Sequence, residues 1–186
     1  MNFCGQCGKP VNFKVPTGDN RKRHVCGHCD TIHYQNPRVI SGCIPMVNDR
    51  VLLCKRAIEP RYGMWTLPAG FLENGETVLQ GALRECWEEA LVKLSEPVLS
   101  GIYDIPHINQ VYILYRGSLH NRSYGAGDES LDVRLFSEAD IPWEELAFPV
   151  ITTALKHHFA DLKQGLSIIH TDVITSRLRS LTNAAD

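Results

Sequence analysis

The sequence predicts an α/β protein preceded by a small zinc-binding module, and three observations lead to this prediction. Two Cys-x-x-Cys pairs lie within the first 30 residues. Several apolar runs with strand character follow them, and residues 80–91 and 148–162 carry apolar side chains at helical spacing. We therefore divide the chain of 186 residues into a zinc ribbon, residues 1–35, and a larger domain, residues 36–186.

The N-terminal module is predicted from the cysteines Cys4, Cys7, Cys26 and Cys29. Their two pairs stand 18 residues apart, which is the spacing of a four-thiolate zinc ribbon. Disulfides and iron are the alternatives; the absence of a secretory leader disfavours disulfides, and zinc is the more usual metal. Because this segment has few large apolar side chains, we expect the metal to supply folding free energy on the order of 10 kcal/mol.

Composition and charge indicate a cytoplasmic enzyme. The formal net charge is −2, so the overall balance does not call for nucleic acid or an acidic membrane as partner. No apolar run approaches the ~20 residues that span a bilayer. The basic run at residues 21–24 could contact nucleic acid, but a solvated turn is the commoner role, and we do not expect nucleic acid to be a partner.

The larger domain begins with two predicted strands, residues 39–47 and 50–56, joined by an Asn-Asp turn. Residues 98–105 and 110–117 also have strand character. Another strand is predicted within residues 128–136, after an acidic start. An amphipathic helix follows over residues 148–162, and the tail from residue 165 could add a strand or pack on a partner subunit.

The stretch at residues 80–91 combines a buried face with a face of carboxylates. Glu85, Glu88 and Glu89 stand at i, i+3 and i+4, while apolar residues recur on the other side. Like charges so close repel one another unless a cation lies between them, and Mg²⁺ or Mn²⁺ prefers carboxylate oxygens. The alternative is a salt-bridged surface helix, in which Arg84 balances the acids.

The spacing of these residues resembles the Nudix box. The matching positions are Gly70, Glu76, Arg84, Glu85, Cys86, Glu88, Glu89 and Val92. The closing glycine of the pattern is Leu91 here. Since a leucine does not adopt a left-handed cap cheaply, we expect the helix to run on or the chain to leave it by another route.

The resemblance implies a Nudix-type mixed β-sheet sandwiched between α-helices, and hydrolysis of the pyrophosphate bond in a nucleoside diphosphate linked to another moiety. It implies that Mg²⁺ or Mn²⁺ is held by Gly70, Glu85, Glu88 and Glu89, with Arg84 orienting a carboxylate. Many Nudix enzymes provide another glutamate at the position of Glu129. Glu85 or Glu129 would then remove the proton from the attacking water, with Asp128 as the fallback and a solvated loop acid as the alternative.

The zinc ribbon narrows the resemblance to the branch that contains NADH, FAD and ADP-ribose pyrophosphatases. NADH pyrophosphatases carry a Ser-Gln-Pro-Trp-Pro-Phe-Pro-x-Ser motif, of which residues 143–149 keep only scattered positions. ADP-ribose or FAD is therefore the expected small-molecule substrate. The alternatives are NADH, the end of an RNA with an NAD-type cap, and a catalytically silent Nudix domain that senses a ligand.

Three residues are predicted to bind the substrate: Arg56, Glu76 and Tyr103. An exposed aromatic ring, Tyr103, Tyr112 or Phe148, could recognise the base, although core packing would explain all three. A homodimer is expected, because compact enzymes of this kind are commonly dimeric.

Overall fold

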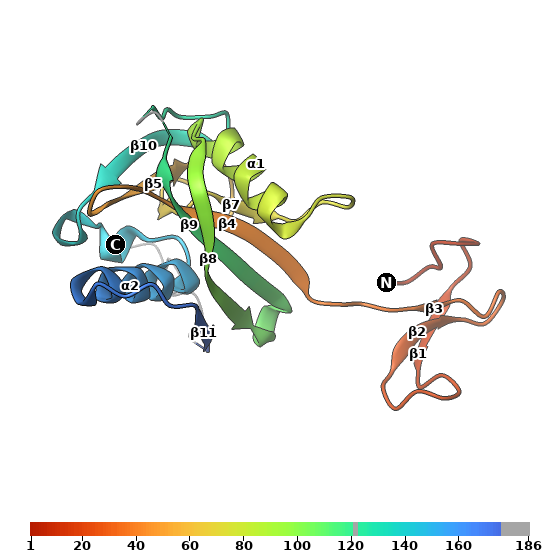
Figure 1. Ribbon diagram of the computed structural model, residues 1–186. Helices are drawn as coiled ribbons and strands as arrows, with labels where there is room; N and C mark the ends of the chain where they lie inside the picture. The colour runs from red at the N-terminus through yellow and green to blue at the C-terminus, as the bar shows by residue number, and fades with distance from the viewer. Residues whose placement is uncertain (121–122, 176–186) are drawn as a thin grey trace, which may run out of the picture. The chain divides into compact units, whose positions relative to one another are not determined.

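The computed structural model describes residues 1–120 and 123–175 (Figure 1). The chain divides into two compact units, Met1–Pro37 and Arg38–Asp186. In the described parts of the chain, no helix is long and apolar enough to cross a membrane.

The Met1–Pro37 unit is a three-stranded antiparallel sheet with very little apolar core. Its strands are β1 (Val11–Lys14), β2 (Arg23–Cys26) and β3 (Ile32–His33), in the order β1-β2-β3. Its buried residues are Cys4, Pro16, Val25 and Cys26. So small a core does not hold a domain of this size together without a cross-link or a metal.

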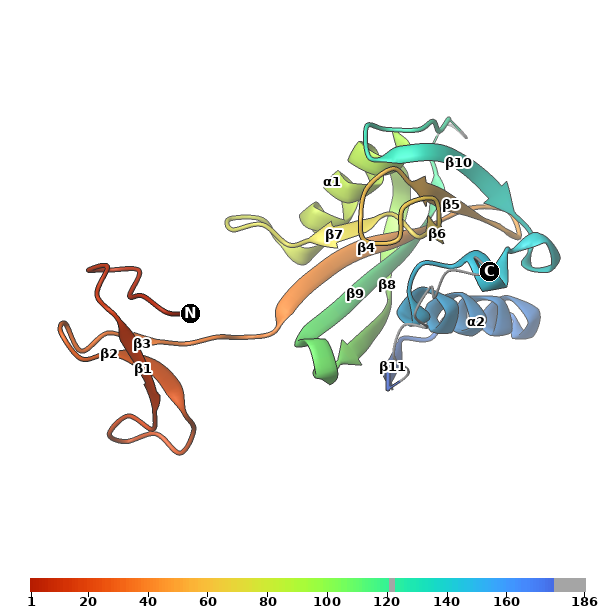
Figure 2. The same cartoon turned by 180° about the vertical axis from the view of Figure 1, so that it is seen from behind.

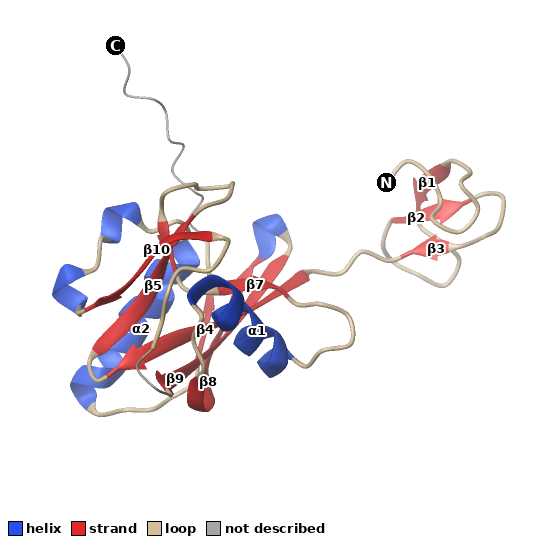
Figure 3. Cartoon of the chain, turned by 90° about the horizontal axis from the view of Figure 1, so that it is seen from above, coloured by secondary structure: helices blue, strands red, loops and turns tan. Residues whose placement is uncertain are grey.

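The Arg38–Asp186 unit is built on one mixed sheet with two α-helices, which confirms the predicted fold class (Figure 3). Its strands and helices are β4 (Arg38–Val47), β5 (Arg50–Arg56), β6 (Trp65–Thr66), β7 (Ala69–Phe71), α1 (Val78–Ala90), β8 (Leu94–Ile105), β9 (Gln110–Leu119), β10 (Ser130–Phe136), α2 (Pro149–Gln164) and β11 (His170–Val173). The main path of the sheet is β10-β5-β4-β9-β8-β11, with β7 on β4 and β6 on β5. The pairs β4–β9 and β8–β11 are parallel, and the others are antiparallel.

The two helices cover opposite faces of this sheet. Neighbouring residues of one strand enter different apolar clusters: Cys43 and Leu52 pack with α1, whereas Ile44 and Leu53 pack with α2. This alternation follows from the two-residue period of a strand, since successive side chains point to opposite faces. Figures 1 and 2 show α1 and α2 on the two sides of strands β4, β9 and β8.

The sequence patterns placed most of these elements. The hairpin β4–β5 closes through the predicted Asn-Asp turn, in which Asn48 has a positive φ of 56°, with Met46 opposite Val51. The helix predicted over residues 148–162 is α2. The predicted strands 98–105 and 110–117 lie within β8 and β9.

The end of α1 differs from the expectation at Leu91. Leu91 adopts the left-handed conformation, with φ 53° and ψ 33°, and α1 ends at Ala90. The Leu91 N–H donates to the Trp87 carbonyl at 2.9 Å, and the Val92 N–H donates to the Cys86 carbonyl at 3.3 Å, so two helix-end carbonyls are satisfied. Val92 is fully buried in the cluster beneath α1. The expectation was wrong because this packing outweighs the local cost, about 1–2 kcal/mol.

Candidate active site

A cavity of about 830 Å³ opens in the Arg38–Asp186 unit beside α1. Charged side chains from α1 and the loop before β10 form part of its wall, together with Gly70 of β7, namely Gly70, Arg84, Glu85, Glu88, Glu89 and Glu129. The rest of the wall is largely apolar and aromatic, and includes Ile40, Ile105, Ile108, Tyr112, Phe148, Val150 and Ile174. The structure thus brings the predicted carboxylates together at one cavity with apolar surface nearby.

Helix α1 is fixed at its start by a capping box. The Thr77 hydroxyl accepts from the Gln80 backbone N–H at 3.2 Å, and the Gln80 side chain accepts from the Thr77 N–H at 2.8 Å. These bonds satisfy helix-end donors that would otherwise lack partners. They fix where the helix begins, and hence which turn of it carries the carboxylates.

Glu85 lies against the backbone of β7 at Gly70. A Cβ atom added to Gly70 would stand 2.4 Å from the Glu85 carboxyl carbon, far inside an ordinary contact. Glu85 is 8% exposed, and burial raises the pKa of its carboxyl, although Arg84 opposes this shift. Because Gly70 has no side chain, the buried Glu85 carboxylate fits against it. This is a steric role for Gly70, the first glycine of the Nudix-box pattern.

Glu89 is the most strongly perturbed carboxyl of the site. It is 5% exposed, and burial together with the nearby Glu85 and Glu129 raises its pKa to about 8, while Arg56 and a backbone hydrogen bond from Ala69 act in the opposite direction. Its Oε2 atom is buried and has no hydrogen-bond partner in the described part of the chain. An ionised carboxylate in this place needs a positive partner.

Arg84 contacts three of the acids, Glu76, Glu85 and Glu88. Its guanidinium makes a forked pair with Glu76, at 2.8 Å and 3.1 Å, and its Nη1 atom also lies 2.6 Å from Glu85 and 3.0 Å from Glu88. The fork lowers the pKa of Glu76 to about 2. Glu88, with a side chain that is 55% exposed, turns toward Arg84 at the edge of the site. Glu76 was expected to contact the substrate, but it does not line the cavity. Its carboxylate pairs with Arg84 instead.

Glu129 lies on the cavity wall just before β10. Its charge raises the pKa values of both Glu85 and Glu89, which places it in the same electrostatic environment. Its backbone carbonyl accepts from the Ala57 N–H at 2.8 Å, next to the end of β5. Asp128, the fallback candidate, is not part of the wall.

The aromatic candidates for substrate binding separate clearly. Tyr112 and Phe148 line the cavity, and the Arg56 guanidinium lies over the Phe148 ring, 5.3 Å from its centre. Tyr103 does not line it: the ring is 1% exposed and its hydroxyl lies 3.3 Å from Nδ1 of His157 on α2. The expectation of an exposed Tyr103 was wrong, because the ring packs in the apolar cluster with α2. Its cross-strand partner Tyr112 packs in the same cluster and is 8% exposed, but it lies on the cavity wall.

The wall also contains polar residues that no sequence pattern pointed to. His107, in the turn between β8 and β9, and Gln110, the first residue of β9, belong to it, as does Glu73 in the loop between β7 and α1. None stands in a periodic or motif position. The fold brings these residues, from two separate loops, to the same cavity wall.

The carboxylates suit a hard divalent cation. The donors are oxygen atoms, one buried Glu89 oxygen has no hydrogen-bond partner among residues 1–120 and 123–175, and the close approach of Glu85 to Gly70 is possible only without a Cβ atom. Of the residues that the structure describes, only the four cysteines form a group of metal-type ligand atoms within 4.8 Å of one another. Arg84 binds both Glu85 and Glu88 and so takes up oxygens that a cation would use.

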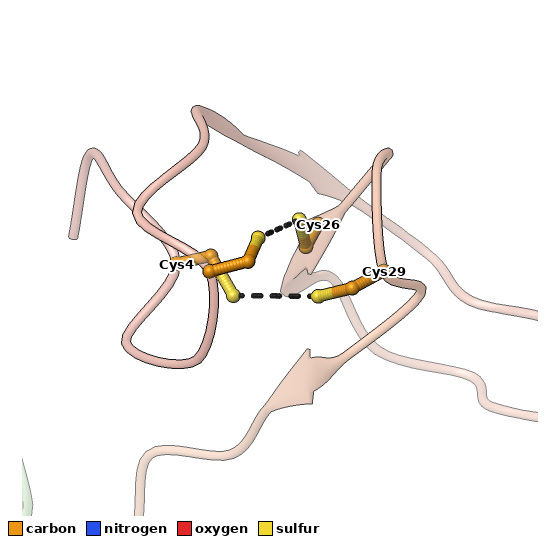
Figure 4. Close-up of side chains that lie close together, drawn as sticks. Cys4, Cys26 and Cys29 are labelled. Carbon is orange, nitrogen blue, oxygen red and sulfur yellow. Dashed lines mark hydrogen bonds between the residues drawn. The ribbon is translucent and has the colours of Figure 1, made fainter.

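The four cysteines of the Met1–Pro37 unit form the second candidate metal centre (Figure 4). The Cys4 and Cys29 sulfurs lie 3.7 Å apart, and those of Cys7 and Cys26 lie 3.5 Å apart. Four tetrahedral Zn–S bonds of about 2.3 Å separate their sulfurs by about 3.8 Å, so the cluster has the right size for zinc. The Nε2 atom of His33 lies 3.2 Å from the Cys4 sulfur and so contacts the cluster from outside.

Comparison with protein families matches both parts of the chain. The family described as Nudix N-terminal, a zinc ribbon, matches residues 2–35, and the NUDIX domain family matches residues 36–154. Among solved structures, one described as a NUDIX hydrolase from Nitrosomonas europaea is 50% identical, with a TM-score of 0.89, and the match covers 94% of this chain and 99% of that one. An ADP-ribose pyrophosphatase from Streptococcus suis is similar in fold, with a TM-score of 0.56 at 21% identity over 75% of this chain and 100% of that one.

Curated relatives are similar over a shorter share of their own length. An NAD-capped RNA hydrolase NudC from Edwardsiella ictaluri (strain 93-146) is 34% identical over 143 residues, which are 74% of this chain and 50% of that protein. A protein of the same name from Vibrio atlanticus (strain LGP32) is 39% identical over 96 residues, 51% of this chain and 34% of the relative. The chain thus spans half or less of the length of these relatives.

Proposed function

The chain belongs to the NUDIX domain family, and from this premise we propose that it is a metal-dependent hydrolase of a nucleoside diphosphate linked to another moiety. The proposed substrates are ADP-ribose or FAD. The proposed cations are Mg²⁺ or Mn²⁺ at the carboxylates of α1, and Zn²⁺ at the four cysteines. The zinc ribbon is assigned to residues 1–35 and the hydrolase domain to residues 36–186.

The buried, unpartnered Oε2 atom of Glu89 is the observation that carries this proposal. Leaving a buried oxygen without a partner costs about 1–3 kcal/mol, and more when the group is charged. A fold carries such an atom more readily when a ligand completes the site. The same helix brings Glu85 to the cavity wall and Glu88 to its edge, so the incomplete atom lies among further oxygen donors.

The acids of the site are assigned two roles, holding the cation and accepting a proton from water. Glu85, Glu88 and Glu89, with the Gly70 carbonyl, would hold the cation, which when bound neutralises the diphosphate and lowers the pKa of a water molecule. Glu129 or Glu85 would accept the proton of the attacking water. Arg84, held by its fork to Glu76, would keep Glu85 and Glu88 in place.

The wall of the cavity supports a substrate with a flat ring system beyond its phosphates. Tyr112 and Phe148 provide aromatic surface, and Arg56, over Phe148, adds a cation. Rings and a guanidinium suit stacking on a base and contact with phosphate. We therefore assign substrate binding to Arg56, Tyr112 and Phe148. Tyr103 and Glu76, which lie away from the wall, are no longer assigned this role.

A second candidate substrate is RNA with an NAD-type cap. The curated relatives are named NAD-capped RNA hydrolases, and the sequence of the ribbon includes the basic run Arg21–His24. RNA held by several phosphate contacts would bind less tightly as salt rises. A small nucleotide would show a much weaker salt dependence.

The test is a panel of ADP-ribose, FAD, NADH and NAD-capped RNA, each assayed with Mg²⁺ and with Mn²⁺. We expect the highest kcat/KM with ADP-ribose or FAD and no turnover after chelation of the metal. Faster turnover of capped RNA, with KM rising steeply between low and high salt, would replace the first candidate by the second. Failure to cleave any diphosphate would contradict the proposed hydrolase.

A further inference from the structure

The backbone around Glu129 is docked on the end of the helix that carries the other acids. The Gly125 N–H donates to the Ala90 carbonyl at 2.9 Å, and the Gly127 N–H donates to the Glu89 carbonyl at 3.1 Å. The last carbonyls of an α-helix lack partners within the helix, so these bonds cap the C-terminal end of α1. The segment before β10 is therefore attached to the same turn that carries Glu88 and Glu89.

The same segment is attached to β5 on its other side. The Ala57 N–H, just after β5, donates to the Glu129 carbonyl at 2.8 Å, and within the segment the Ser130 N–H donates to the Gly127 carbonyl at 3.0 Å. Ser130 pairs with Arg56, and the register then slips by a bulge before Asp132. Bulges next to active sites commonly re-aim a side chain. The Glu129 backbone is thus held between α1 and β5 by hydrogen bonds on both sides.

Gly127 is the position where this docking leaves no room for a side chain. A Cβ atom added there would lie 1.7 Å from the Glu88 carbonyl oxygen and 2.8 Å from the Glu88 carbonyl carbon. At Gly125, two residues earlier, an added Cβ would lie 3.5 Å from its nearest neighbour, a methyl carbon of Leu91, which is an ordinary contact. Neither glycine has a positive φ, so the two positions differ in space and not in backbone conformation.

We propose that Gly127 is a positioning residue for the reaction, which lets the backbone of residues 125–130 close onto α1 and so places Glu129 opposite Glu85 and Glu89. The inference rests on the proposed function, because only the proposed hydrolysis gives Glu129 a part in catalysis. Gly127 acts on the chemistry only through Glu129 and does not contact the substrate.

The expected loss of kcat follows from the distance between the added Cβ and the Glu88 carbonyl oxygen. To reach an ordinary separation of 3.4 Å from the Glu88 oxygen, a Cβ at residue 127 must move the segment by about 1.7 Å. Misplacing a reacting group by about 1 Å can cost about 100-fold in rate. For Gly127→Ala we expect kcat to fall about 100-fold with ADP-ribose and Mg²⁺, with KM within about threefold. Gly125→Ala is the matched control, with kcat close to that of the unaltered chain.

A double-variant cycle separates positioning from a general loss of structure. Glu129→Gln alone should lower kcat, and Gly127→Ala combined with Glu129→Gln should be no slower than Glu129→Gln alone, because Gly127 acts through that side chain. Multiplying effects in the double variant would overturn the proposal, as would a normal kcat for Gly127→Ala. A normal kcat for Glu129→Gln would overturn it too, while the hydrolase itself is tested separately by Glu88→Gln.

A second variant covers the case in which Gly127→Ala does not fold. One glycine inserted between Gly127 and Asp128 adds no side chain at the tight contact, yet it separates Glu129 from its anchor on α1. We expect kcat to fall about as far as in Glu129→Gln, with thermal unfolding close to that of the unaltered chain. An inserted chain with unchanged kcat would overturn the proposal.

Discussion

Gly70→Ala is the substitution that tests the geometry of the carboxylates most simply. The added Cβ would lie 2.4 Å from Cδ and Oε1 of Glu85 and 2.5 Å from Oε2. Ordinary contacts begin near 3.4 Å, so the carboxylate must retreat by about 1 Å. A displacement of this size is expected to lower kcat about 100-fold, or about 2.7 kcal/mol in activation free energy.

The assay measures kcat for ADP-ribose at saturating Mg²⁺, together with the midpoint of thermal unfolding. Gly70 has no positive φ, so alanine fits the backbone there, and we expect the midpoint to shift by no more than about 4 °C. Loss of activity without loss of stability would therefore report on Glu85. Gly125→Ala, where an added Cβ has ordinary contacts, is the control for a glycine-to-alanine change near α1.

A compensating change makes the same experiment more specific. Glu85→Asp shortens the side chain by one methylene, and in the Gly70→Ala chain it should restore part of the lost turnover because the Cβ then meets no carboxylate. In the unaltered chain the same change should lower turnover. A Gly70→Ala chain with kcat within about threefold of normal would refute the role given to this contact, and so would the absence of any rescue.

Three further sets of substitutions test the carboxylates, the cysteines and a buried histidine. Glu88→Gln and Glu89→Gln should each lower kcat by orders of magnitude with an unchanged circular dichroism spectrum; near-normal turnover in both would remove the metal site. Cys4→Ser combined with Cys26→Ser should release one zinc ion per chain, measured by elemental analysis, and increase hydrogen exchange in residues 1–35; a metal-free chain with unchanged exchange would contradict the ribbon. Burial, and secondarily Arg116, lowers the pKa of His158 from 6.5 to about 4, so the folded state disfavours its charged form. The free energy of unfolding should therefore fall as pH drops from 6.5 toward 4, by about 2 kcal/mol at pH 5 from this group, and His158→Gln should show a smaller fall in urea titrations; an equal fall would exclude His158 as the cause.

Local patterns predicted the elements well because they carry their own signals. Strand character identified β8 and β9, the Asn-Asp turn identified the β4–β5 hairpin, and the helical spacing of apolar residues identified α1 to within two residues at its start. The pairing of β11 with β8 could not be predicted in the same way. Parallel pairing between segments distant in sequence depends on the whole sheet, and the short strand has no distinctive pattern.

The sequence indicated which residue types belong to the candidate site, but not which of them are buried or what they contact. The spacing of Glu85, Glu88 and Glu89 placed them on one helix, but it did not show that Glu89 is buried and Glu88 exposed. The misplacement of Tyr103 has the same origin, because the strand pattern around a tyrosine does not show which helix its face of the sheet meets. Gly127 went unnoticed because a lone glycine in a polar loop gives no sequence signal for a tight contact.

The proposed metal site is tested most directly by a crystal of the chain grown with Mn²⁺ and a non-hydrolysable ADP-ribose analogue, examined for anomalous scattering. We expect a manganese peak bonded to Glu89 and at least one of Glu85 and Glu88, with the diphosphate on the open side of the ion. A peak elsewhere, or none while the analogue is bound, would contradict the proposed metal site.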